Sequence, residues 1–289
     1  MNRTVRAVAL NVLIWAQPTS LTAQLLAARD GPIVYGHHHL NATNIEEHKQ
    51  FWANTLGGTV VRVGTDSLEI IKFPNALLFM RSQPPTAGTA GGALDHIGFS
   101  VPSLRQTIDK VTESGYEVVA IHEAPPGVTA GNGPALESDG NITGTAYVLG
   151  PDNVKVELVE IREQTVPIVS HHVHFVGQQP AEMRTWYMRL FGAPPRPGET
   201  EVFMGANLPG IGLDFSRSTD APAGTRGRAL DHIGFEVKNL EEFCKGLEAK
   251  GIKLDVPYRR VAALDVAIAF VTDPWGTYIE LTEGLDRVP

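Results

Sequence analysis

The sequence contains very little cysteine, no cluster of basic residues and no long apolar run. Cys244 is the only cysteine among 289 residues, which excludes an intrachain disulfide and a metal site built from several thiolates. The formal net charge is −8. Without a Lys/Arg cluster, this charge argues against a nucleic-acid partner, because proteins that bind nucleic acid gather basic residues against the phosphates. The most apolar stretch, near the N-terminus, is too short to cross a bilayer, so we expect no membrane span.

The first thirty residues differ in composition from the rest of the chain. Two arginines within the first six residues precede a mostly apolar stretch at 7–16, and small residues follow near positions 22 and 27. This order is typical of a secretory signal peptide. We therefore interpret residues 1–28 as a signal peptide, predict a mature N-terminus near Gln24 or Arg29, and expect an exported or periplasmic protein. If the segment is an ordinary N-terminal helix, we expect a cytoplasmic protein.

One heptapeptide occurs twice, as residues 93–99 and again as residues 229–235, with the sequence Ala-Leu-Asp-His-Ile-Gly-Phe. Such identity indicates an internal duplication. In a strand, alternate side chains share a face. His96 would then lie beside Gly98, and His232 beside Gly234, with apolar residues on the opposite face. Each copy can therefore pack one face into a core and present a histidine, with free space next to it, on the other.

Four histidine-containing segments recur at nearly equal intervals, at 36–40, 95–98, 170–174 and 231–234. Each is followed by a predicted helix, and the helices begin after Asn44, Ser103, Pro180 and Asn239, which are typical of helix starts. Each helix is followed by several predicted strands. The length favours two domains. We therefore predict two domains in chain order, residues 33–161 and residues 166–286, each made of two strand–helix–strands modules.

Two matched segments add one acidic residue to each half. Glu157 and Glu280 each follow a proline-containing turn and lie in an otherwise apolar strand. Two histidines and one glutamate can hold a divalent metal and leave coordination positions open, which suits non-haem Fe(II) and also catalytic Zn(II). The predicted ligand sets are His37, His96 and Glu157 in the first half, and His172, His232 and Glu280 in the second. We expect Fe(II), with Zn(II), Mn(II) and Ni(II) as alternatives.

The two predicted sites differ in the residue two positions before the glutamate, and this difference predicts which site binds a metal ion better. Lys155 precedes Glu157 on the same strand face and could compete with a cation for the carboxylate. Tyr278 precedes Glu280, adds no positive charge and could act as a general acid. We therefore prefer the second site and predict Tyr278 and His174 as catalytic residues.

These motifs resemble the vicinal oxygen chelate superfamily, which includes glyoxalase I, bleomycin resistance proteins and extradiol ring-cleaving dioxygenases. The resemblance extends from about residue 33 to residue 285. It implies an α+β fold in which four βαβββ modules pair into two half-barrel domains. It also implies a metal-dependent enzyme acting on a small oxygen-bearing molecule, most similar to the extradiol dioxygenases. In those enzymes a tyrosine stands where this chain has Phe270, and a histidine stands near the position of Ala262 and Ala263.

Two alternatives remain open. One is a glyoxalase-like lyase, isomerase or epimerase, in which the metal polarises vicinal oxygens or stabilises an enolate. The other is a non-catalytic small-molecule binder similar to the bleomycin resistance proteins, although a binder needs no metal ligands. Oxygen consumption would separate the dioxygenase from the lyase. The sequence does not determine the substrate or the oligomeric state.

Overall fold

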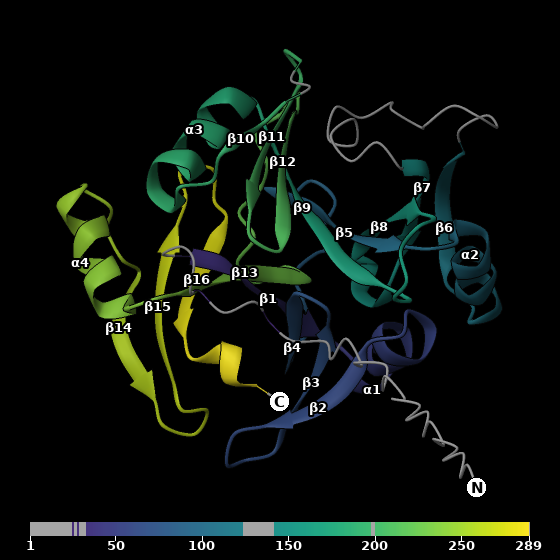
Figure 1. Cartoon of the computed structure of the whole chain (residues 1–289), viewed down its shortest axis with the longest axis horizontal. Helices are drawn as coiled ribbons and strands as arrows, with labels where there is room; N and C mark the ends of the chain where they lie inside the picture. The colour runs from purple at the N-terminus through teal and green to yellow at the C-terminus, as the bar shows by residue number, and fades with distance from the viewer. Residues whose placement is uncertain (1–24, 26–27, 29–32, 124–141, 198–199, 289) are drawn as a thin grey trace, which may run out of the picture.

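The computed structural model describes Leu25, Ala28 and residues 33–123, 142–197 and 200–288. The predicted signal peptide lies outside the described residues, apart from Leu25 and Ala28. The described chain forms the four predicted modules, each a strand, a helix and further strands (Figure 1).

The first module consists of β1 (Ile33–Ala42), α1 (Ile45–Lys49) with its π-helical continuation η1 (Gln50–Thr55), β2 (Thr59–Val63), β3 (Leu68–Phe73) and β4 (Ala76–Ser82). The second consists of β5 (Leu94–Val101), α2 (Leu104–Glu113), β6 (Glu117–Glu123), β7 (Ile142–Leu149), the 3-10 turn η2 (Pro151–Asn153) and β8 (Lys155–Ile161). The third consists of β9 (Val169–Gly177), α3 (Pro180–Phe191), β10 (Pro195–Arg196), β11 (Phe203–Leu208) and β12 (Ile211–Arg217). The fourth consists of β13 (Leu230–Val237), α4 (Leu240–Ala249), β14 (Val256–Val261), β15 (Val266–Thr272), β16 (Tyr278–Glu283) and the 3-10 turn η3 (Leu285–Arg287).

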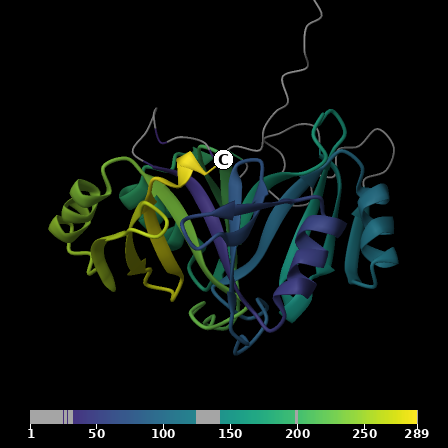
Figure 2. The same ribbon diagram turned by 90° about the horizontal axis from the view of Figure 1, so that it is seen from below.

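The first module shares a sheet with the fourth, and the second module shares a sheet with the third. One sheet has the strand order β14-β15-β16-β13-β1-β4-β3-β2 and joins the fourth module to the first. The other has the order β10-β11-β12-β9-β5-β8-β7-β6 and joins the third module to the second. In each sheet two modules meet through their first strands, β1 with β13 and β5 with β9, which run antiparallel. Figure 2 shows the two curved sheets side by side, with α4 and α2 at opposite ends.

The predicted division into residues 33–161 and residues 166–286 therefore does not describe the sheets. Equal spacing along the chain identifies repeated modules, but it does not determine which modules share a sheet. The short segment after β8 leads directly into β9, which pairs with β5 on the edge opposite β8. The first and second modules meet instead in the core on the helix side. Phe99 of the second module packs against Trp52 and Phe73 of the first, with ring centroids 6.1 and 4.7 Å apart.

The apolar faces of the repeated strands are buried, as the alternation predicted. Ile97, Phe99, Ile233 and Phe235 have no exposed surface and belong to one continuous hydrophobic cluster. Because these faces pack into the core, the opposite faces, which carry His96 and His232, line the inside of the two curved sheets. The fold thus places the histidines where a cavity can form.

Three of the four predicted helix starts, Asn44, Ser103 and Asn239, have a side chain that can cap a helix, and two of these side chains do so. The side chain of Asn44 accepts hydrogen bonds from the amides of Glu46 and Glu47, and Ser103 accepts one from Gln106. A helix begins after Asn239 as predicted, but Asn239 adopts a left-handed backbone with φ of 55° and its side chain makes no cap bond. The carboxylate of Glu283 accepts the Leu240 amide at 3.0 Å instead. Glu283, which comes from β16, therefore caps α4 in place of Asn239.

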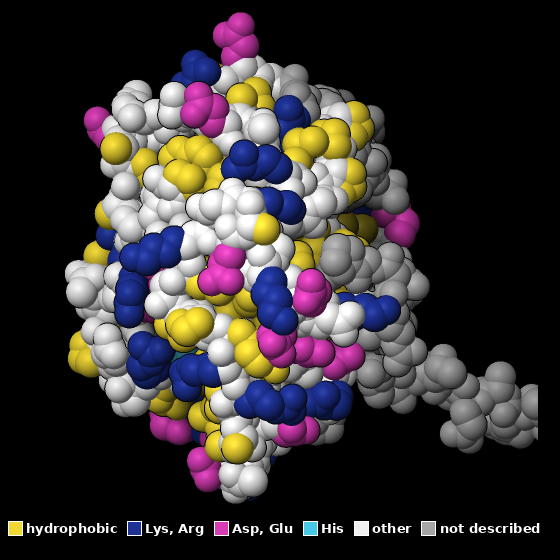
Figure 3. All heavy atoms as spheres, turned by 90° about the vertical axis from the view of Figure 1, so that its left-hand side faces the viewer, with side chains coloured by type: hydrophobic (Ala, Val, Ile, Leu, Met, Phe, Trp, Pro, Cys, Tyr) yellow, Lys and Arg dark blue, Asp and Glu magenta, His cyan; other side chains and the backbone are white. Residues whose placement is uncertain are grey.

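On the face that contains α3 and α4, basic, acidic and apolar side chains are interspersed (Figure 3). No helix in the described part of the chain is long and apolar enough to span a membrane.

Candidate metal centres

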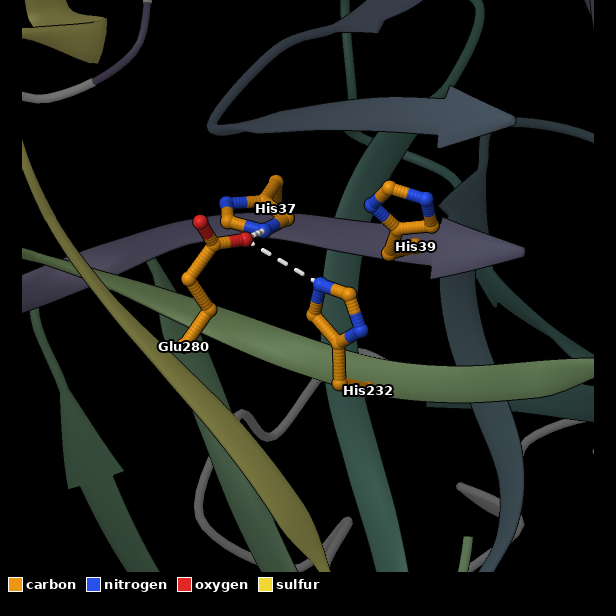
Figure 4. Close-up of side chains that lie close together, drawn as sticks. All are labelled: His37, His39, His232 and Glu280. Atoms are coloured by element: carbon orange, nitrogen blue, oxygen red, sulfur yellow. Dashed lines mark hydrogen bonds and ion pairs between the residues drawn. The ribbon is translucent and has the colours of Figure 1, made fainter. Parts of the chain in front are cut away.

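Strand register brings four side chains together on the inner face of the first sheet. His39 of β1 pairs with His232 of β13, and His37 of β1 pairs with Gly234. Gly234 in turn lies beside Glu280 of β16. His37, His39, His232 and Glu280 therefore converge, and their ligand atoms all lie within 4.8 Å of one another (Figure 4). We call this group the first cluster.

The same register builds a second cluster in the other sheet. His96 of β5 pairs with His174 of β9, and Gly98 pairs with His172. Gly98 also lies beside Glu157 of β8. The ligand atoms of the second cluster, His96, Glu157, His172 and His174, again lie within 4.8 Å of one another.

The structure contains all six predicted ligands but groups them differently. The pairs His232–Glu280 and His96–Glu157 are present as predicted, whereas His37 and His172 have exchanged places. The two glycines explain how the exchange is accommodated. A side chain at Gly234 would overlap the ring of His37, and one at Gly98 would overlap the ring of His172. The free space predicted beside each repeated histidine is thus filled by an imidazole from the partner module.

Glu280 connects the imidazoles of the first cluster. Its Oε2 lies 2.9 Å from His37 Nε2 and 3.1 Å from His232 Nε2. The other ring nitrogen of His232, Nδ1, lies 2.6 Å from Asp231 Oδ1. Asp231 is itself held by the Gly227 amide and by the Asn41 side chain. A carboxylate at Nδ1 fixes the imidazole ring so that Nε2 faces the cluster, an arrangement common behind histidine metal ligands.

This role of Asp231 and its counterpart Asp95 is not apparent from strand alternation. Alternation places each aspartate on the face opposite the histidine that follows it. The short carboxylate nevertheless reaches the imidazole of the next residue, with a distance of 2.7 Å from Asp95 Oδ1 to His96 Nδ1. The signal that could have revealed the pair is the Asp-His dipeptide, which occurs in both copies of the repeated heptapeptide.

The electrostatics of the first cluster follow from burial and these hydrogen bonds. Burial opposes ionisation of Glu280, but the bonds from His232 and His37 outweigh it and hold the pKa of Glu280 well below its usual range. Burial also opposes protonation of His232, yet the carboxylates of Asp231 and Glu280 raise its pKa. Burial lowers the pKa of His37 and lowers that of His39 strongly. Glu280 is thus ionised and His37 and His39 are neutral, the states that metal ligands need, whereas the raised pKa of His232 means that a bound ion would displace a proton from its imidazole.

The second cluster has the same internal bonds. Glu157 Oε2 lies 2.9 Å from His96 Nε2 and 3.1 Å from His172 Nε2. Burial opposes ionisation of Glu157, but its histidine partners lower its pKa well below the usual value. Burial lowers the pKa of His172, whereas Asp95 and Glu157 together overcome burial and raise that of His96.

Lys155 does not contact Glu157 as predicted. Its Nζ lies 2.6 Å from Asp95 Oδ1 and 4.6 Å from the centre of the Tyr147 ring. The lysine neutralises the aspartate behind His96 and leaves Glu157 to the two histidines. Lys155 therefore does not compete with a cation for Glu157, and it gives no reason to prefer one site over the other.

The residues of the first cluster fit a divalent metal ion. Nδ1 of His37 and Nε2 of His39 are buried and have no hydrogen-bond partner within the described part of the chain. Imidazole nitrogens and a carboxylate oxygen are the donors that Fe(II), Zn(II) and Mn(II) take in proteins. His37, His232 and Glu280 would hold the ion, and His39 is within reach as a fourth group.

A cavity of about 280 Å³ opens beside the first cluster, and His37, His39, His232 and Glu280 all line it. Most of its wall is apolar, formed by Leu68, Phe79, Val261, Leu264, Val266, Ile268, Phe270 and Leu285. Such a cavity accommodates a small organic molecule and limits the access of water.

The second cluster has different neighbours. In the first cluster, Phe79 pairs with His39. In the second cluster, the corresponding residue is Asp214, which pairs with His174. Asp214 is not a free ligand, because it forms a buried ion pair with Arg196. Nε2 of His174 lies 2.8 Å from the Ser216 hydroxyl, and burial lowers the pKa of His174 well below its usual value.

The two predicted catalytic residues lie at different clusters. His174 belongs to the second cluster. Tyr278 borders the first cluster, with its ring centre 5.6 Å from that of His232 and stacked on Phe270 at 4.8 Å. Burial raises the pKa of Tyr278, which favours its neutral form. A catalytic role for either residue stays a prediction.

Comparison with known proteins agrees with this architecture. Residues 169–281 match the model of the Glyoxalase/Bleomycin resistance protein/Dioxygenase superfamily. Glyoxalase I from Zea mays has a similar fold, with a TM-score of 0.64 at 12% identity over 88% of this chain and 94% of that chain. A variant of the same enzyme gives 0.65 at 11% identity, over 89% and 95% of the two chains. A candidate dioxygenase from Bacillus subtilis gives 0.64 at 14% identity, over 86% and 84%. No curated protein sequence matches this chain.

Proposed function

We propose that the chain is a member of the Glyoxalase/Bleomycin resistance protein/Dioxygenase superfamily, whose model matches residues 169–281, and that it is a metal-dependent enzyme acting on a small oxygen-bearing molecule. The proposed site is the first cluster, with His37, His232 and Glu280 as ligands. The observation that carries this proposal is that these three side chains converge on the wall of an apolar cavity. This assignment replaces the predicted set of His172, His232 and Glu280.

A divalent ion held by two imidazoles and one carboxylate would act as a Lewis acid toward adjacent substrate oxygens. We favour Fe(II) and a dioxygenase reaction, since the donor count is that of non-haem iron oxygenases. Zn(II), Mn(II) and Ni(II) are the alternatives for the other reactions. The chain's own contribution is to bind and orient. Asp231 keeps Nε2 of His232 directed into the cluster, and the apolar wall keeps water away from the bound molecule.

A second candidate reaction is that of a lyase, isomerase or epimerase, and His39 favours it. Its half-buried ring borders the cavity, and its Nε2 has no partner among the described residues. A neutral imidazole in this position can accept a proton from a substrate atom and return it to another. Phe270, which lies opposite Glu280, offers no hydroxyl for acid catalysis.

Metal and oxygen measurements test the proposal. Protein purified without added metal should contain a divalent ion, and Glu280→Gln should lose the ion from the first cluster. Glu157→Gln is the matched control, because it changes the same residue type in the second cluster. Oxygen uptake with a panel of catechols supports the dioxygenase. Turnover of 2-oxoaldehyde adducts without oxygen uptake supports the lyase. A protein without metal, or with activity unchanged in Glu280→Gln, would exclude the proposed site.

A further inference from the structure

Two arginines stand out in the wall of the cavity. Arg81 of β4 and Arg259 of β14 line it together with eight apolar side chains and the first cluster. Both residues are exposed. Apart from Glu280, the side chains that line the cavity include no acidic group. Glu280 is already engaged by His37 and His232. The rim of this cavity therefore carries excess positive charge, although the chain as a whole is acidic.

Neither guanidinium group is paired within the described residues. Other surface arginines of the same sheet are paired: Arg62 binds Glu69, and Arg260 and Arg287 bind Asp265. Arg259 is the immediate neighbour of Arg260 but points to the cavity side of β14 and has no such partner. Five N–H donors on each unpaired guanidinium group remain available for a planar anion.

The second cluster serves as an internal comparison, because the register of its strands is the same. Arg81 pairs with Asn41, two residues beyond His39, whereas Ser216 pairs with Val176, two residues beyond His174. Arg259 of β14 pairs with Ile268 of β15. Two residues further along β15, Phe270 pairs with Glu280. In the second cluster, His122 of β6 pairs with Thr145 of β7, and two residues further along β7, Tyr147 pairs with Glu157. His122 therefore occupies the strand position that corresponds to Arg259. Both arginines therefore belong to the first cluster alone and are not a general feature of the repeated module.

We infer that the ligand of the first cluster is a small organic anion, whose carboxylate contacts Arg81 and Arg259 while its apolar body fills the cavity. A carboxylate accepts hydrogen bonds from guanidinium groups in a bidentate geometry that a neutral ester or amide does not match. The inference rests on the proposed function in one respect only, namely that the other end of the molecule presents its oxygens to the first cluster. The cavity of about 280 Å³ suits a molecule of one ring or a short chain.

The first part of the test measures charge selectivity without relying on metal. Binding of benzoate and of methyl benzoate is compared by ligand-observed NMR, and binding of 3,4-dihydroxybenzoate and its methyl ester by calorimetry. We expect each acid to bind about tenfold more tightly than its ester at low salt, and the difference to shrink as salt rises, since both arginines are partly exposed. In the double variant Arg81→Gln/Arg259→Gln, the acid and the ester should bind equally.

Arg260→Gln is the matched control, because it removes a neighbouring arginine that is paired with Asp265 and does not line the cavity. It should retain the preference for the acid. No preference in the unaltered protein, or a preference that survives in the double variant, would overturn the inference.

The second part separates this inference from the proposed function. Glu280→Gln should weaken binding of both dihydroxy compounds equally and keep the preference for benzoate over its ester. If Glu280→Gln leaves the dihydroxy compounds unaffected while the preference persists, the proposed metal site fails and the anion site stands.

Discussion

Replacing His37 tests directly whether the first module shares a sheet, and a cluster, with the fourth module. The structure places His37 Nε2 2.9 Å from Glu280 Oε2, although 243 residues separate them in the chain. The side chains are 1% and 13% exposed, so water screens this contact poorly. A hydrogen bond to a charged group is worth about 1.5–3 kcal/mol. We therefore expect a coupling energy of that order between His37→Ala and Glu280→Ala.

The assay is a double-mutant cycle on the free energy of unfolding, measured in urea with a chelator present so that no metal contributes. The His37→Ala, Glu280→Ala and double variants form the first cycle. His37→Ala combined with Glu157→Ala forms the control cycle. Residues in separate sheets with no shared partner should couple by less than about 0.5 kcal/mol. The cycle isolates the contact because cavity terms of the single variants cancel.

The metal content of the same variants, purified without chelator, gives a second measurement. His37→Ala and Glu280→Ala should remove the same ion, and the double variant should lose no more than either single change. His37→Ala with Glu157→Ala should lose the ion of the first cluster to the same extent as His37→Ala alone. A large coupling of His37 to Glu157, with none to Glu280, would refute the crossed pairing and restore the grouping expected from chain order.

Four further predictions follow from individual contacts. Asp231→Asn should weaken metal binding at the first cluster about 10–100-fold, as is typical when a partner behind a histidine ligand is lost, and competition with a chromogenic chelator measures this. Gly234→Ala should displace the His37 ring and lower both the melting temperature and the metal content of the first cluster. Gly246→Ala, where an added Cβ meets no neighbour within 4 Å, should do neither. Burial lowers the pKa of His48, so the unfolded chain takes up a proton that the folded chain disfavours. The free energy of unfolding should therefore fall as the pH drops below about 6.5, and His48→Gln should show a smaller fall in urea titrations at several pH values. If the protein is exported, cleavage should occur near Gln24 and not at Arg29, because Leu25 is 3% exposed in a hydrophobic cluster that cleavage at Arg29 would disrupt; mass spectrometry of protein from native cells decides between the two positions.

Much of the fold could be predicted because it depends on local pattern. Alternation placed Ile97 and Phe99 in the core and His96 on the opposite face, and the structure confirms both. The pairing of His96 with Glu157, and of His232 with Glu280, also followed from the sequence, since each pair lies in adjacent parallel strands of a single module. Within one module the chain itself limits which strands can be neighbours.

The partners of His37 and His172 could not be predicted in this way. Each first strand could pair with the first strand of more than one other module, and the regular spacing of the modules along the chain does not distinguish between these partners. The choice depends on packing over the whole molecule, in which the helix-side core joins the first module to the second, while the sheets join the first module to the fourth and the second to the third. The contact of Lys155 was missed for a related reason. Strand alternation considers only neighbours on the same strand, whereas Asp95 lies on the adjacent strand and offers the lysine a closer carboxylate.

The two clusters show why the ligand motif alone does not define the function of either site. Both contain three histidines and a glutamate at the same register, and both have an aspartate behind the repeated histidine. Their differences lie in residues that are not ligands. Phe79 and Arg81 border the first cluster, where Asp214 and Ser216 stand beside the second. An aspartate neutralised by Arg196 and a serine bonded to His174 make the second cluster a closed polar network. A phenylalanine and an unpaired arginine leave the first cluster an apolar wall with a charged rim. Duplication has thus preserved the donors, while the neighbouring strand positions determine which molecule each site can accept.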